Sequence, residues 1–172
     1  REGIPGSLLG GHRAPGGPGM RALGIDEYRR YFFTVVPDAR VLFYDMNDGV
    51  QALEFPFPGL EPGTPVVASS RSLLGNFLAA GTSDGRVALA QARYIPKYEN
   101  EKLSGLDVSV RERGLATVDP AGRPVREVSY NEESEGTRYV AAIVGDHEVA
   151  LWRADDAGDM RQAVVTIEGG RK

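Results

Sequence analysis

Two histidines, His12 and His147, are the only imidazole side chains available for acid–base chemistry near neutral pH. His12 lies in a glycine-rich stretch, and His147 lies between two carboxylates, Asp146 and Glu148, beside an expected hairpin turn. Neither accompanies a nucleophile motif such as G-x-S-x-G. The chain has no cysteine, which excludes thiolate nucleophiles, disulfides and cysteine-based zinc sites. We therefore expect His147 to be a solvated turn residue.

Three groups of acidic side chains could in principle bind a cation or transfer protons. Asp45, Asn47 and Asp48 supply oxygen ligands, but they do not match the calcium-loop spacing D-x-[DN]-x-[DN]-G with a following Glu. We expect them to cap a hairpin. Residues 155–159 and the acidic run at 132–135 are interpreted as solvated loops. No catalytic, metal-binding or cofactor-binding residue is assigned, and the protein is predicted not to be an enzyme.

Phosphate binding is the next chemistry to consider. The glycines at 10–11 and 16–19 lack the preceding strand, the following helix and the Lys-Ser/Thr pair of a P-loop. Arg29, Arg30 and Arg123 could offer guanidinium forks, yet nothing in the sequence groups them, so no site is assigned. Lys and Arg number 20 against 24 Asp and Glu, a net charge of -4, which makes nucleic acid an unexpected partner.

The elements that would position these side chains are short β-strands. Residues 31–36 are rich in aromatic and β-branched side chains, and a Pro-Asp-Ala turn leads into a second strand at 40–45. Asn-Asp-Gly at 47–49 is a strong hairpin signal before a third strand. Only residues 24–30 could form a short helical turn. The same strand pattern returns at residues 65–68, 76–81, 86–91, 137–144, 148–153 and 163–167.

Three hairpins align along the chain, and each opens its second strand with a valine: Val41, Val87 and Val149. The spacings are 46 and 62 residues, against about 40–50 for propeller blades. The excess falls in residues 94–124, which are interpreted as an inserted loop. We predict an all-β, propeller-like (WD40-like) antiparallel meander of about three blades; a β-sandwich or barrel is the alternative.

The predicted domain organisation is a Gly/Pro-rich leader or linker at residues 1–24 followed by a single domain at 25–172. The repeats are expected near residues 30–57, 65–93 and 126–168. No apolar run is long enough for a membrane helix. Because the chain begins with Arg1 and shows no signal-peptide core, we expect it to be a piece of a longer protein.

Several apolar side chains have expected roles in packing or binding. Trp152 and Tyr139 are expected to pack between adjacent blades. The alternating Phe and Pro of residues 55–58 cannot occupy a central strand, so an exposed Phe is expected there as a partner contact. Three repeats leave two open apolar flanks, and we expect these to be covered by self-association or by the leader and the insertion.

Residues 82–87 (TSDGRV), a polar loop containing Tyr94 and Tyr98, and residues 117–125 (TVDPAGRPV) resemble a segment of the long-form phosphate ABC-transporter permeases of proteobacteria. Residues 41–49 are similar to the start of the same extramembrane domain, so the resemblance covers roughly residues 40–152. It implies a β-propeller-like domain on the periplasmic side of the inner membrane, with other transporter subunits or a periplasmic phosphate-binding protein as partners. That family's domain is much longer than this chain. A free-standing propeller-like binding module is the alternative function.

Overall fold

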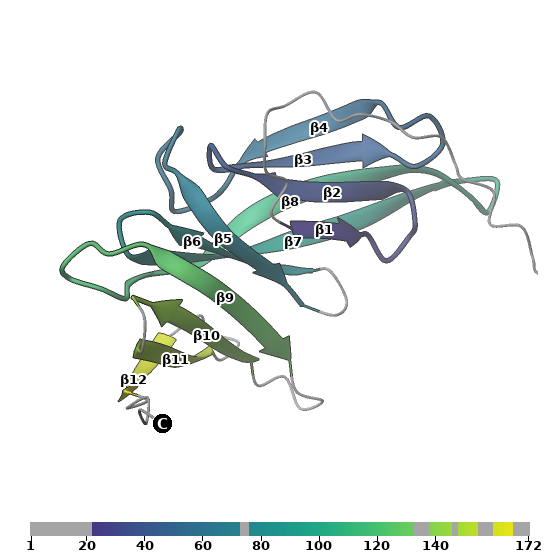
Figure 1. The fold of residues 1–172 in the computed structure, drawn as a ribbon. Coiled ribbons are helices and arrows are strands. Elements are labelled where there is room, and N and C mark those ends of the chain that lie inside the picture. Colours follow the sequence, from purple (N-terminus) through teal and green to yellow (C-terminus); the bar gives the residue numbers. More distant parts are fainter. Residues whose placement is uncertain (1–21, 73–75, 133–137, 146–147, 155–159, 167–172) are drawn as a thin grey trace, which may run out of the picture.

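The computed structural model describes residues 22–72, 76–132, 138–145, 148–154 and 160–166. These residues form three four-stranded antiparallel sheets, each with its strands in chain order, and they contain no helix (Figure 1). Each sheet is therefore an up-and-down meander of the kind that makes one propeller blade. The all-β, propeller-like prediction is confirmed.

Blade 1 is formed by β1 (Ala22–Ile25), β2 (Tyr31–Val36), β3 (Arg40–Asp45) and β4 (Gln51–Pro56). The predicted turn at residues 37–40 joins β2 to β3. No helix forms at residues 24–30, because β1 ends at Ile25 and a tight turn follows. Three residues of the expected leader, 22–24, belong instead to β1, which pairs with β2.

Blade 2 is formed by β5 (Val66–Arg71), β6 (Phe77–Thr82), β7 (Arg86–Glu99) and β8 (Lys102–Thr117). The prediction of an inserted loop at residues 94–124 is wrong for most of that range. The strands β7 (14 residues) and β8 (16 residues) continue through it as one hairpin. Asn100 and Glu101 make its two-residue turn with φ values of 48° and 63°. Such turns require positive φ at both positions. The charged side chains that suggest a loop lie along an exposed ribbon.

Blade 3 is formed by β9 (Val125–Glu132), β10 (Arg138–Val144), β11 (Glu148–Ala154) and β12 (Met160–Thr166). β10 and β11 pair as the predicted third hairpin, with Val144 opposite Glu148. His12, His147, the glycines at 10–11 and 16–19, and residues 155–159 lie outside the described residues. So do residues 133–135 of the acidic run, while Glu132 ends β9.

Blade 2 packs between the other two blades, and its strands show why. Every residue of β6 is buried. Leu78 and Ala80 join the core shared with blade 1, while Phe77 and Ala79 join the core shared with blade 3. Successive side chains of a strand point to opposite faces, so one short apolar strand serves two cores. β5 lies against β9 and β1 lies against β5, which places the first strands of the three blades side by side.

The three aligned valines occupy equivalent places, since each is the second residue of its strand: β3, β7 and β11. Val41 is fully buried in the core between blades 1 and 2, and Val87 is fully buried between blades 2 and 3. Val149 occupies the corresponding position in blade 3, with its side chain on the corresponding face of the sheet. Its neighbour Ala150 is buried against blade 2, so Val149 faces away from blade 2 and is only partly buried. The repeat alignment is confirmed, and blade 3 presents an outer face like those that blades 1 and 2 bury.

Two expectations about aromatic side chains are wrong. Phe57 is fully buried in the core, and Phe55 is partly buried and packs edge to face on Phe43, so this segment does not present an exposed Phe. Tyr139 lies on the face of β10 opposite buried Val140, away from blade 2. The side chain of Trp152 lies outside the described part of the structure.

Candidate interaction surface

The turns between the second and third strands of blades 1 and 2 share one structure. In each, an Arg Nε donates a hydrogen bond to the Oδ2 of an Asp two residues earlier: Arg40 to Asp38 at 2.8 Å and Arg86 to Asp84 at 2.9 Å. Each bond holds the pKa of its Asp below the ordinary value. The residue between, Ala39 or Gly85, has φ of 61° or 80°. These exposed pairs shape the turns and contribute little to stability.

The two segments that carry the family resemblance, 82–87 and 117–125, lie against each other. The carbonyl of Gly85 accepts hydrogen bonds from the backbone N–H groups of Val118 (2.8 Å) and Asp119 (3.1 Å). Asp119 is buried and accepts from the N–H groups of Ala121 and Arg123. This contact fixes the connection from blade 2 to blade 3, so a structural reason accounts for both motifs.

Arg123 is the one candidate phosphate-binding arginine in that connection, and its guanidinium is occupied. Nε lies 2.6 Å from Asp119 Oδ2, and one terminal nitrogen lies 2.5 Å from Glu148 Oε2. The Arg123 hydrogen bond is the largest influence lowering the pKa of Asp119. Arg123 thus ties the blade 2–3 connection to the start of β11.

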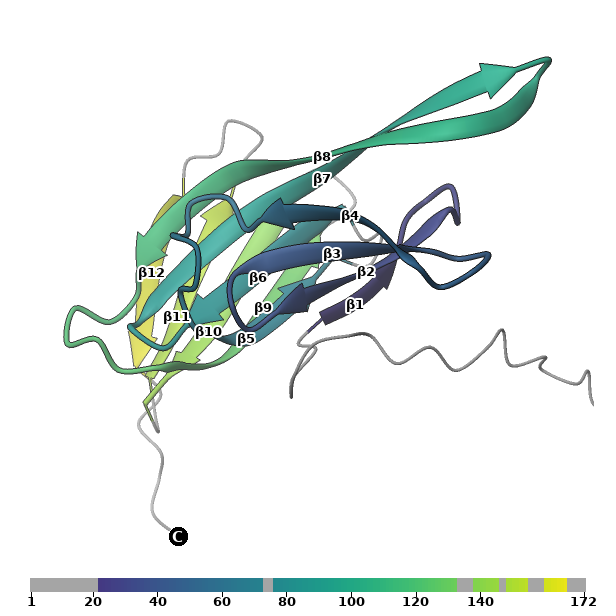
Figure 2. The same ribbon diagram turned by 90° about the horizontal axis from the view of Figure 1, so that it is seen from above.

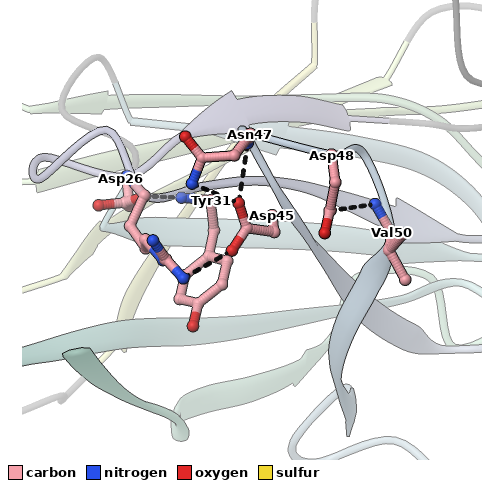
Figure 3. A network of polar contacts seen from close by, with 7 residues as sticks. Asp26, Tyr31, Asp45, Asn47, Asp48 and Val50 are labelled. Atoms are coloured by element: carbon pink, nitrogen blue, oxygen red, sulfur yellow. Dashed lines mark hydrogen bonds and ion pairs between the residues drawn. The ribbon is translucent and has the colours of Figure 1, made fainter. Parts of the chain in front are cut away.

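The oxygen cluster at 45–48 caps the β3–β4 turn, as predicted (Figure 3). Asp45 Oδ1 accepts from the backbone N–H and the side-chain amide of Asn47, at 2.8 and 2.9 Å. Asp48 Oδ1 accepts from the N–H of Val50 at 2.8 Å. Asp45 Oδ2 pairs with Arg30 at 2.8 Å, so this second candidate arginine is also engaged.

Asp26 organises the neighbouring β1–β2 turn, where the sequence suggested it only as a residue suited to the start of a short helical turn. Its carboxylate is buried and accepts hydrogen bonds from the backbone N–H groups of Tyr28 and Arg30. It also accepts one from the backbone N–H of Tyr31 (Figure 3). The turn also places Arg29, the third candidate arginine, in the left-handed region with φ of 56°. The sequence feature that indicates such a turn is an Asp directly after a short apolar strand.

The hairpin of β7 and β8 continues past blade 2 as a two-stranded ribbon, here called the arm (residues 92–110). β6 pairs with β7 only as far as Gln91. Beyond that point the arm passes along blade 1 and projects past the end of the sheets (Figure 2). Tyr94 and Leu106 are buried in the core shared with blade 1, and the Tyr94 ring lies edge to face on Phe43 at 6.5 Å. The base of the arm is therefore anchored, and its tip projects beyond the sheets.

The arm has two different faces. The inner face, which includes Tyr94 and Leu106 at its base, ends in the paired residues Tyr98 and Leu103 at the tip. Their exposed fractions are 59% and 39%. The outer face carries Ile95, also 59% exposed, and an ion pair of Lys97 with Asp107 at 2.7 Å. Large apolar side chains held out in water on a projecting ribbon are typical of interaction surfaces.

The β7 edge of the arm is poorly suited to pairing with a further strand. Pro96 lies in the middle of the arm segment of β7 and has no N–H to donate, and Lys97 beside it is charged. Proline and lysine on an edge strand oppose edge-to-edge association. A partner at the β7 edge is therefore expected to bind through side chains.

The base of the arm and the β1–β2 turn contribute to one core, since Tyr28 packs partly buried against the cluster that contains Tyr94. The Tyr94 hydroxyl is buried and has no hydrogen-bond partner in the described structure. Burial raises its pKa, and the carboxylates of Asp26 and Glu27 raise it further. The pKa of Tyr28 is raised by desolvation, by Glu27, by Tyr98 and by Asp26. The sequence predicts that Tyr94 and Tyr98 lie on one face of the strand, because residues four apart in a strand share a face.

Within the described residues, no three His, Asp or Glu side chains converge as a metal site would require. Over the same residues, no helix has the length and apolar character to cross a membrane.

Comparison with known proteins supports the fold. No protein-family model matches the chain, and no curated protein matches it. Among solved structures, the β-propeller domain of Cps50 (Swd1) from Myceliophteria thermophila is similar, with a TM-score of 0.51 and 12% sequence identity. The match covers 85% of this chain and 39% of that one, so the chain spans well under half the length of the propeller it matches. At this identity the likeness establishes a propeller-like fold alone.

Proposed function

We propose that this protein is a propeller-like interaction module whose rigid blades present the arm to a partner protein. The observation that supports this proposal is the structure of the arm. Its base is anchored by Tyr94 and Leu106, while Tyr98 and Leu103 at its tip are exposed to water. A protein partner would bury these side chains, and aromatic anchors contribute most to such interfaces. The propeller-like fold is compatible with this role, since it offers a stiff platform with variable loops.

Site-specific photo-crosslinking tests the proposal. A benzophenone amino acid is placed at Tyr98, Leu103 or Ile95 of the arm, or at Val50 on the β3–β4 turn, in the parent protein in its native cells. A discrete light-dependent adduct at the arm is expected. The absence of an adduct at all four positions, with the protein folded and expressed, would contradict an interaction function.

A finer proposal gives the module a place in phosphate import. The resemblance of residues 82–87 and 117–125 to phosphate ABC-transporter permeases favours an extramembrane domain on the periplasmic face of the bacterial inner membrane. In that setting the partners are other transporter subunits or a periplasmic phosphate-binding protein. The alternative is a free-standing binding module with no transport role.

The two settings differ in measurable ways. In the transporter, the parent protein fractionates with the inner membrane, and substituting Tyr98 and Leu103 by serine lowers phosphate uptake without lowering the amount of protein. A parent reading frame without membrane helices would contradict the transporter and leave the free-standing module.

A further inference from the structure

The face of blade 3 that points away from blade 2, here called the outer face, is apolar at its centre. Alternate residues of β10 and β11 are buried against blade 2, so the residues between them point outward. The described outward residues of these two strands are all apolar and partly exposed: Tyr139, Ala141, Ile143, Val149 and Leu151. β9 places exposed Glu127 and Ser129 beside them on the same face. An apolar centre with a polar rim is the usual composition of an interface.

The outer face repeats, position by position, a face that blades 1 and 2 also have. In each blade, two cross-strand pairs between the second and third strands carry apolar side chains or glycine. The pairs are Val35–Val41 and Phe33–Phe43 in blade 1, Gly81–Val87 and Ala79–Leu89 in blade 2, and Ile143–Val149 and Ala141–Leu151 in blade 3. An aromatic residue lies four positions before the first of these pairs in every second strand: Tyr31, Phe77 and Tyr139.

In blades 1 and 2 this face is covered by the next blade. Val41 and Val87 are fully buried there, whereas Val149 is only partly buried. Phe77 of blade 2 stacks on Tyr130 of blade 3, with ring centroids 5.7 Å apart. The covering residues of the central strands are small or medium-sized: Leu78, Ala80, Ala88 and Ala90 on blade 2, and Val140, Ala142, Val144 and Ala150 on blade 3. The two filled interfaces therefore show which kind of surface fits such a face.

A second copy of the chain does not offer that surface. The equivalent covering face would be the far face of blade 1, where Leu42 and Tyr44 are 4% and 2% exposed and so are already buried. Two outer faces related by a two-fold axis would instead place the large side chains of Ile143 and Tyr139 against their own kind. Terminal repeats of an array carry a polar outer face, which blade 3 lacks, and closed propellers contain about 4–8 blades.

We propose that the outer face of blade 3 docks a further four-stranded propeller blade, which belongs to the parent polypeptide and presents alanine and valine side chains on its central strands. This blade buries Val149 as blade 3 buries Val87. The proposal goes beyond the interaction function at the arm, because it concerns a different part of the molecule.

Thiol protection tests whether the face is covered. The chain contains no cysteine, so one introduced thiol reports access at one position. Val149→Cys is made in the 172-residue chain and in the parent protein, and mass spectrometry of the peptide containing residue 149 gives the rate of maleimide modification. The thiol is expected to react in the isolated chain and at least about tenfold more slowly in the parent protein.

Two variants are matched controls for this measurement. Val87→Cys occupies the equivalent position in blade 2, which blade 3 already covers, so it should react slowly in both proteins. Val50→Cys, at a side chain 62% exposed on the β3–β4 turn, should react at the same fast rate in both. Circular dichroism confirms that each variant is folded.

Photo-crosslinking identifies the occupant. A benzophenone amino acid is placed at Ile143 of the parent protein, which is then purified and irradiated. The expected adduct is intramolecular and joins Ile143 to a segment of the parent polypeptide outside these 172 residues, in a strand with alternate alanine or valine residues.

Several outcomes overturn the proposal. These are equal rates for Val149→Cys in the two proteins, a slow rate in the isolated chain at every concentration, or an adduct with a second copy or a different protein. Protection of the isolated chain that disappears on dilution would make a second copy the occupant. A parent sequence without a further four-strand repeat contradicts it as well. The crosslinks at Tyr98, Leu103 and Ile95 test the arm separately, so either proposal can fail alone.

Discussion

Gly85 lies so close to the backbone of Asp119 that a Cβ added to Gly85 would be 2.8 Å from the Asp119 carbonyl oxygen. The same Cβ would be 3.0 Å from the carbonyl oxygen of Arg123. Gly85 also has φ of +80° and accepts two backbone hydrogen bonds through its own carbonyl. The turn of blade 2 and the connection to blade 3 are therefore fitted together by backbone contacts that admit no side chain.

Gly85→Ala is expected to lower the free energy of unfolding by about 2–4 kcal/mol, from the left-handed conformation together with the clash. Gly63→Ala is the matched control: its φ is +82°, but nothing lies within 4 Å of the added Cβ. It should cost only about 1–2 kcal/mol. Urea denaturation measures both, and equal losses would show that the backbone contact contributes nothing.

Phe43 is the aromatic centre of the core between blades 1 and 2. Its ring meets those of Phe33, Phe55 and Tyr94 at centroid distances of 5.5, 5.8 and 6.5 Å. Phe43→Ala is expected to cost about 3–5 kcal/mol. Val50→Ala, at a side chain 62% exposed, should stay within about 0.5 kcal/mol of the wild type. Chemical denaturation compares them, and a loss below about 1 kcal/mol at Phe43 would contradict the packing described.

Removing the Tyr94 hydroxyl should not destabilise the fold. Because this oxygen is buried and unpartnered, Tyr94→Phe is expected to leave the free energy of unfolding unchanged or raise it by up to about 1 kcal/mol. Tyr44→Phe is the matched case, since the Tyr44 hydroxyl is also buried without a partner. Thermal unfolding gives the comparison. A loss above about 1 kcal/mol at Tyr94 would mean that the hydroxyl has a bonded partner.

Acid should unfold the protein partly through carboxylates that are paired in the native state. Hydrogen bonds from Arg40, Arg86 and Arg123 lower the pKa values of Asp38, Asp84 and Asp119. A group whose folded pKa is depressed contributes stability above its ordinary value, here 3.8, and that stability is lost as pH falls through the lower folded value.

We therefore expect the urea midpoint to be level near neutral pH and to fall steadily below about pH 4. Asp119→Asn should lower the urea midpoint at pH 6. It should also make the fall of the midpoint below pH 4 shallower, because the variant lacks one of the carboxylates whose protonation destabilises the folded state. An unchanged decline in the variant would contradict the role assigned to the Asp119–Arg123 pair.

The sequence alone determined the second and third strands of each blade, the turns that join them and their repetition. Val41, Val87 and Val149 identify equivalent strand positions because a two-residue side-chain period and a turn of fixed length leave little choice of register. The capping role of Asp45 could also be predicted, since Asx side chains bond to backbone N–H groups two residues away.

Tertiary structure decided what these local elements become in space. Residues 94–99 and 102–110 are polar enough to be taken for a loop, yet pairing across β7 and β8 and burial of Tyr94 and Leu106 against blade 1 make them an arm. Phe57 is buried for a similar reason: a neighbouring blade covers it, and local propensity contains no information about that neighbour. Tyr28 packs against the core that contains Tyr94 only because the fold brings together residues that lie far apart in sequence.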